Sequence, residues 1–315
     1  MKHNTKITLI LITMFLLTQL IGLFIISVYA NELELPYGFQ NSGIESQSVA
    51  SGISSIIFAF IIALLLFIFL SKFNAETFIR IWFLIVISLA LGLTFTAIFH
   101  KLNIINYTSY IALIIAIPLA YIKIFKRNLI VHNITELLIY PGVGAIFVFL
   151  MLELFAEKVI WGITILLLII SLYDIWAVWK SEVMQKMAKY QINNLKFFTG
   201  FFIPYASKKD RDKIKQIKQK YLLKGEKFLE RKLEKSKIKV NLAILGGGDI
   251  IFPIITAGIF YQVYNSILPA LIIILFSTIA LLALFTLARK GKFYPAMPFI
   301  TTGLYLGMFI NYLLF

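Results

Sequence analysis

The 315-residue chain contains no cysteine, and only 14% of its residues are charged. Without cysteine, the chain can form no disulfide, no thiolate metal site and no cysteine nucleophile. Its three histidines, His3, His100 and His132, lie far apart and lack the spacing of metal ligands. We expect them to be solvated residues near the ends of membrane spans, and we expect neither a metal nor an organic cofactor.

Apolar residues make up 60% of the chain, whereas a soluble domain is about half apolar and about a quarter charged. They fall into blocks of about 20 residues, the length of a helix that crosses a bilayer. A helix satisfies its own backbone hydrogen bonds where no water is present. The sequence therefore predicts an all-α membrane protein, a polytopic bundle of nine transmembrane helices. The expected spans are 6–29, 50–70, 78–99, 104–123, 134–154, 159–179, 240–260, 266–288 and 294–314.

The orientation of the bundle follows from its basic residues, because the Lys and Arg excess alternates from side to side along the chain. The positive-inside rule then predicts a multi-pass protein of the cell membrane with a cytoplasmic N-terminus and an external C-terminus. The apolar core of the first span is too long for a typical signal peptide. The expected parts are a six-span part (1–179), a basic cytoplasmic loop (180–239) and a three-span part (240–315).

The expected loop 180–239 holds 18 Lys or Arg residues against six acidic ones, and so supplies most of the net charge of +15. Apolar residues recur in it near helical spacing, which predicts an amphipathic helix on a leaflet of anionic lipids. They are Ile214, Ile217, Tyr221, Leu222, Leu229 and Leu233. The loop lacks interleaved aromatic residues at a suitable spacing, so we expect no nucleic-acid partner.

Two carboxylates, Asp174 in LLIISLYDIWAVWK and Asp249 in LGGGDIIFP, lie well inside apolar segments, whereas the other acidic residues lie in loops or at span ends. A charged Asp at the centre of a span costs about 2.5–3.5 kcal/mol, which favours a functional role over hydrogen bonding between helices. Both can lie at similar depth on consecutive antiparallel helices. If they meet in a wet cavity, one keeps its proton, and the pair can activate water and polarise a carbonyl.

Glycines precede Asp249, and prolines lie at the start of the last expected span. The three glycines before Asp249 lack a Cβ, so the backbone of an extended peptide could approach closely, although ordinary helix packing would explain them as well. Pro295 and Pro298 prevent a regular start of the last span and leave backbone groups that could bind a substrate. A simple helix N-terminus marked by proline is the alternative.

Three stretches, on the sixth, seventh and ninth expected spans, read Tyr173-Asp174, Gly246-Gly247-Gly248-Asp249 and Pro295-Ala296-Met297. In this order they resemble the motifs of the presenilin and signal peptide peptidase family of GxGD intramembrane aspartyl proteases. The family carries Pro-Ala-Leu in the ninth span, so Met297 is a departure. Nine spans with a long loop after the sixth extend the resemblance to the whole chain, as in an archaeal-type presenilin homologue.

This resemblance implies an intramembrane aspartic endopeptidase with Asp174 and Asp249 as its catalytic dyad. Tyr173 and the three glycines would support the site, and Pro295, Ala296 and Met297 would shape it and help to seat the substrate. The expected partners are protein substrates with a transmembrane helix that cross with the N-terminus outside. Self-association into a homo-oligomer stays open.

Other functions also fit two buried carboxylates. A cation or proton transporter or channel uses such groups along its ion path, but the broken helices and inverted repeats typical of transporters are not evident here. A prepilin peptidase shares the Gly-x-Gly-Asp pattern, but its usual Lys after the Asp is replaced by Ile250, Ile251 and Phe252. A non-catalytic scaffold with a membrane-docking loop is a third alternative.

Overall fold

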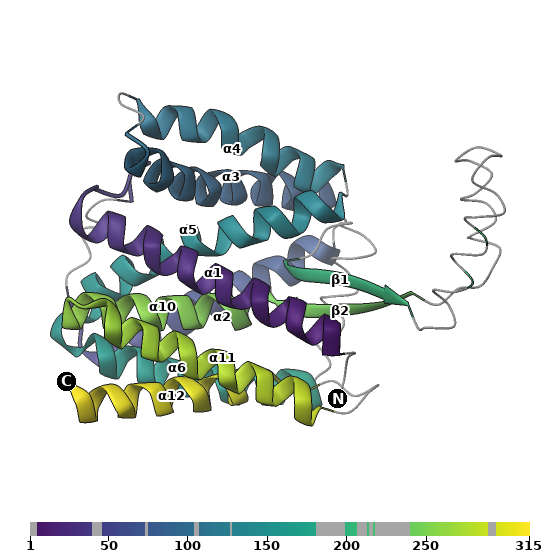
Figure 1. Ribbon diagram of the computed structural model, residues 1–315. Helices are drawn as coiled ribbons and strands as arrows, with labels where there is room; N and C mark the ends of the chain where they lie inside the picture. The colour runs from purple at the N-terminus through teal and green to yellow at the C-terminus, as the bar shows by residue number, and fades with distance from the viewer. Residues whose placement is uncertain are drawn as a thin grey trace.

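The apolar blocks of the sequence fold into long helices, which the computed structural model of the chain arranges as a bundle with a two-stranded ribbon at one end (Figure 1). The structure describes residues 5–39, 46–72, 75–103, 107–126, 128–180, 199–206, 240–288 and 294–315, and the single residues 213 and 217. The predicted amphipathic helix within 180–239 lies almost wholly outside this part and stays a prediction.

The N-terminal helices follow the predicted spans to within a few residues. They are α1 (Thr5–Asn31), α2 (Val49–Lys72), α3 (Glu76–Lys101), α4 (Thr108–Phe125), α5 (Leu129–Phe155) and α6 (Val159–Trp179), with the short 3-10 helix η1 (Ala156–Lys158) between the last two. Asn128 caps α5, because its Oδ1 accepts hydrogen bonds from the N–H groups of Ile130 and Val131. This cap places the start of α5 five residues before the predicted one.

The C-terminal part begins with strands rather than with the predicted helix. Its elements are β1 (Gly200–Ala206), β2 (Val240–Gly246), α10 (Gly247–Tyr264), α11 (Ile267–Leu287) and α12 (Met297–Leu314). The predicted start of a helix at residue 240 was wrong, because residues 240–246 form β2 and the helix begins at Gly247. The two strands pair antiparallel from Gly200 opposite Gly246 to Ala206 opposite Val240. They satisfy each other's backbone groups, and consecutive glycines, which are poor helix formers, separate β2 from the interior of α10.

Nine membrane spans were predicted, but fewer stretches of the described residues are long and apolar enough to cross a membrane. Seven stretches of the described residues meet them: Thr5–Asn31, Val49–Leu70, Glu76–Lys101, Thr108–Phe125, Leu129–Trp179, Ile267–Leu287 and Met297–Leu314. The fifth stretch runs through α5, η1 and α6 without a break, and α10 is not among the seven. A multi-pass helical membrane protein is therefore supported, while the count of nine is not confirmed.

Helix α10 lies in the middle of the bundle, in contact with α1, α5, α6, α11 and α12. Its side chains Ile250, Ile254 and Phe260 are buried in the main apolar core. Figure 1 shows α3 and α4 on one side of the bundle and α11 and α12 on the other. The N-terminal end of α1 and the ribbon lie at one end of the bundle, and the C-terminus lies at the other.

Candidate active site

Asp174 is held against the first residue of α12. Its side chain on α6 is only 5% exposed, and its Oδ2 accepts a hydrogen bond of 3.0 Å from the Met297 N–H. The first N–H groups of a helix lack a partner within the helix, and Ala296 at the N-cap has no side-chain oxygen to supply one. Asp174 therefore caps α12 from a distant part of the chain, at the end of the helix where a negative charge is favoured.

Two further hydrogen bonds join α6 to α12 at residues further along α12 than Met297. The Ser171 hydroxyl donates to Thr301 Oγ1 at 2.7 Å, and the Tyr305 hydroxyl donates to the carbonyl of Thr164 at 2.6 Å. The two helices run antiparallel, since residue numbers fall on α6 as they rise on α12. These contacts fix the height and the rotation of the helix that carries Asp174.

Tyr173 faces a different neighbour from Asp174. Its half-buried ring packs edge-on against Phe60 of α2, with ring centroids 5.3 Å apart, and lies at a tilt to Trp176. Successive residues of a helix point about 100° apart, so this ring and the Asp174 carboxylate serve different interfaces. Tyr173 thus joins α6 to α2.

Asp249 lies at the junction of β2 and α10, as the third residue of the helix. It is half-buried. A Cβ on Gly246 would lie 3.2 Å from Asp249 Oδ2, so the carboxylate folds back over the N-cap residue. An acidic side chain in the first turn also complements the dipole of the helix.

The three glycines before Asp249 have different surroundings. A Cβ on Gly247 would lie 2.9 Å from the hydroxyl and from the ring of Tyr140, which packs directly on the backbone there. A Cβ on Gly248 would meet nothing within 4 Å, and this residue is exposed. Gly246 and Gly247 therefore make room for groups of the protein itself, and Gly248 faces open space.

The structure brings several of the predicted site residues together. Met297 contacts Asp174, Pro295 is buried and Ala296 half-buried just before α12, and α6 packs against α10. Asp174 and Asp249 therefore lie on neighbouring helices. Their action as a dyad stays a prediction.

Gln19 of α1 was not predicted to belong to the site. This residue is buried, and its Nε2 donates a hydrogen bond of 3.0 Å to the carbonyl of Ile250, the residue after Asp249. This bond lies in the same turn of α10 as Pro253, which has no N–H to donate to the Asp249 carbonyl as a regular helix would. The only available signal was an amide side chain inside an otherwise apolar span.

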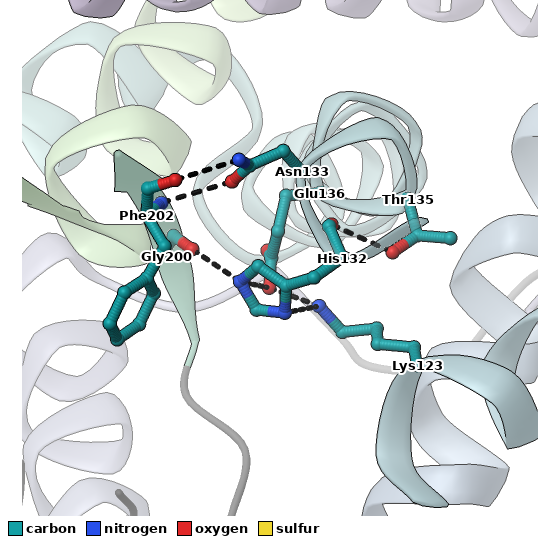
Figure 2. Close-up of polar contacts among 7 residues, drawn as sticks. All are labelled: Lys123, His132, Asn133, Thr135, Glu136, Gly200 and Phe202. Carbon is teal, nitrogen blue, oxygen red and sulfur yellow. Dashed lines mark hydrogen bonds and ion pairs between the residues drawn. The ribbon is translucent and has the colours of Figure 1, made fainter. Parts of the chain in front are cut away.

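Three charged or polar side chains form a buried cluster where α4, α5 and β1 meet (Figure 2). Lys123 makes an ion pair with Glu136, and its Nζ lies 3.3 Å from His132 Nδ1. His132 Nε2 lies 2.8 Å from the carbonyl oxygen of Gly200. We call these three side chains the Lys123–His132–Glu136 cluster.

This cluster corrects two predictions. His132 is not a solvated residue but 7% exposed, and Glu136 is 1% exposed although only Asp174 and Asp249 were expected inside apolar segments. The predicted span began at residue 134, whereas α5 begins at Leu129, so Glu136 lies inside the helix. Burial of a charge is costly unless it is paired, and Lys123 supplies the pair.

Comparison with known proteins agrees with this architecture. Residues 12–315 match the family described as signal-peptide peptidase, presenilin aspartyl protease. Two solved structures of a presenilin family intramembrane aspartate protease, in C222 and P2 space groups, have the same fold. The first is 19% identical with a TM-score of 0.59, over 98% of this chain and 99% of that one. The second is 18% identical with a TM-score of 0.57, over 97% of each. No curated protein matches the chain significantly.

The fold and the buried carboxylates thus define a multi-pass helical membrane protein with acidic groups inside its bundle. The family match covers nearly the whole chain. The chain belongs to the signal-peptide peptidase and presenilin family of aspartyl proteases. It is an intramembrane aspartyl protease of the presenilin type.

Proposed function

We propose that the protein hydrolyses peptide bonds within the transmembrane segments of membrane proteins, with Asp174 and Asp249 as its catalytic dyad. The observation that carries this proposal is the placement of both residues on α6 and α10, which pack against each other in a chain of this family. The contact of Asp174 with Met297 supports a role for the Pro295-Ala296-Met297 stretch at the same site.

The two carboxylates would divide the chemistry between them. The ionised one takes a proton from water, and the protonated one donates a hydrogen bond to the scissile carbonyl. Water adds to the carbonyl carbon, the C–N bond breaks, and the departing nitrogen receives a proton. The protons belong to the pair, because close carboxylates titrate jointly.

A substrate must be extended at the cleaved bond, because helical hydrogen bonds cover its carbonyl. β2 pairs with β1 along one edge, and within the described residues no strand pairs with its other edge. A peptide that adds there as a further strand would run toward Gly248, whose surroundings leave room for another backbone. This arrangement supports binding of the substrate next to Asp249.

The wider setting of the protein follows from its charge pattern. We infer a cytoplasmic N-terminus in the cell membrane and a basic segment 180–239 that lies on anionic lipids. The division into parts 1–179 and 240–315 fits a site built between α6 and α10. The substrates would be single-span proteins, and self-association is not required by the geometry of the site.

Cleavage of a single-span substrate by the purified protein in detergent tests the proposal. We expect Asp174→Ala and Asp249→Ala each to lower turnover by about 10³-fold or more, as for loss of a general acid or base. Glu157→Ala in the exposed η1 serves as the matched control and should keep the parent rate. Near-normal cleavage by either Asp variant would rule out the paired-acid mechanism.

The alternative of a cation or proton transporter is separated by a second measurement. Ion flux into vesicles that hold the protein should be absent or should be unchanged by the two Asp variants. If flux depends on Asp174 and Asp249 while the parent cleaves no peptide, the transporter hypothesis replaces the protease.

A further inference from the structure

The Lys123–His132–Glu136 cluster lies outside the proposed dyad and has no part in its chemistry. Lys123 is 2% exposed, His132 7% and Glu136 1%. Apolar residues of similar size in place of a buried ion pair often leave stability unchanged or raise it. A gain in stability therefore does not explain why these three side chains are buried together.

The hydrogen bonds of the cluster set the orientation of the His132 ring. The Lys123 ammonium has only hydrogens to donate, so His132 Nδ1 accepts from it. The other ring nitrogen, Nε2, then carries the hydrogen and donates it to the carbonyl of Gly200 on β1. Lys123 and Glu136 neutralise each other, and the ring they hold is a fixed donor aimed at the first residue of β1.

The neighbouring residue of α5 holds the same strand. Asn133 Nδ2 donates to the carbonyl of Phe202 at 2.7 Å, and the Phe202 N–H donates to Asn133 Oδ1 at 3.0 Å. Figure 2 shows both side chains reaching from α5 to β1. The backbone of β1 is thus held at Gly200 and at Phe202 by adjacent residues of one helix.

β1 pairs directly with the residue that starts the turn of Asp249. Gly200 is the register partner of Gly246, which is the N-cap residue of α10 and lies three residues before Asp249. Tyr140, two turns beyond His132 on α5, packs on Gly247. The same helix therefore holds both β1 and the first turn of α10.

We propose that Lys123, His132 and Glu136 are positioning residues for intramembrane cleavage. They hold β1 in place, and the Gly200–Gly246 pair transmits that position to the turn that carries Asp249. The inference rests on the proposed function, because it takes Asp249 to be catalytic. It assigns the cluster no contact with the substrate.

Substitutions at His132 separate positioning from simple folding. His132→Leu removes the donor to Gly200, and we expect kcat to fall at least tenfold with little change in KM. His132→Gln keeps an N–H donor and should retain most of the parent kcat. A double variant, Lys123→Met with Glu136→Leu, removes the charge pair without leaving a lone charge, and it should lower kcat as His132→Leu does while the unfolding temperature stays near that of the parent.

Thr94→Val is the matched control. The Thr94 hydroxyl donates to the carbonyl of Leu138 on the same helix α5, at 2.7 Å, but comes from α3 and not from β1. We expect this variant to keep the parent kcat. An equal fall in kcat for Thr94→Val, or a parent-like kcat for both His132→Leu and the double variant, would overturn the proposal.

Amide hydrogen exchange measures the position of the strands without any cleavage. His132→Leu and the double variant should speed exchange in residues 199–206 and 240–249, and Thr94→Val should not. If the parent cleaves nothing, the proposed function fails, and exchange still decides whether the cluster holds β1. Unchanged exchange in both cluster variants would overturn the positioning role.

Discussion

Asp174 and Asp249 are held by different means. Asp174 lies within a long helix, and bonds between helices fix it, since its carboxylate caps α12 and Ser171 is bonded to Thr301. Asp249 lies at a junction between a strand and a helix, and the shape of the backbone fixes it, through glycines that leave room for its own carboxylate and for Tyr140. Asp174 therefore depends on hydrogen bonds between helices, and Asp249 depends on the absence of a Cβ at Gly246 and Gly247.

This difference predicts which substitutions each half of the site tolerates. Hydrogen bonds between membrane helices are individually weak, about 0.6 kcal/mol on average. We therefore expect the loss of one such bond near Asp174 to lower stability only slightly. Steric crowding at a glycine costs more, because packed groups must shift. We therefore expect a single substitution at a closely packed glycine near Asp249 to cause a large loss of stability.

The largest effect is expected from Gly247→Ala. The new Cβ would lie 2.9 Å from the ring and hydroxyl of Tyr140, so we expect a loss of about 1–3 kcal/mol in stability and a strong loss of cleavage. Thermal unfolding in detergent and the cleavage assay measure both. In a Tyr140→Leu background, where the clashing atoms are gone, the same substitution should cost much less. An equal cost in both backgrounds would contradict the assigned contact.

A smaller and more selective effect is expected from Gly248→Ala. The new methyl group meets no protein atom within 4 Å, so stability should match the parent or exceed it slightly. If a substrate backbone approaches there, kcat/KM should fall about tenfold, equivalent to about 1.4 kcal/mol. Parent-like kcat/KM in this variant would argue against substrate binding beside Gly248.

The smallest effect is expected at the bond between Ser171 and Thr301. A double-mutant cycle with Ser171→Ala and Thr301→Val should give a coupling energy of about 0.6 kcal/mol in unfolding. Cleavage should fall only slightly, because the Met297 cap still holds Asp174. A coupling energy above about 2 kcal/mol would contradict the comparison, because substitutions near Asp174 would then cost as much stability as those near Asp249.

The sequence predicted the features that rest on local patterns. Runs of apolar residues located most helices to within a few residues, and the Tyr173-Asp174 and Pro295-Ala296-Met297 stretches fell on α6 and at the start of α12. The family prediction is confirmed by the match over residues 12–315. Each apolar run and each motif by itself lies within about 20 residues of the chain, the length of one membrane span.

The features that were missed depend on distant parts of the chain. The segment VNLAILG reads as an apolar block, and it becomes a strand only because GFFIPYA of β1 pairs with it. Lys123 and Glu136 each lie near the end of an apolar run, where a charged residue is normally solvated. Only the approach of α4 to α5 buries them together, and no local pattern encodes that approach.

The antiparallel ribbon has a consequence for the chain between its strands. Ala206 and Val240 are register partners, so these two residues lie opposite each other at the end of the ribbon. The free-energy cost of closing a flexible chain between two fixed ends rises only slowly with its length, by about 0.6 kcal/mol for each doubling. A reporter or an affinity handle inserted there would therefore leave the two anchoring strands in register, which makes this segment the natural attachment point for labelling the protein.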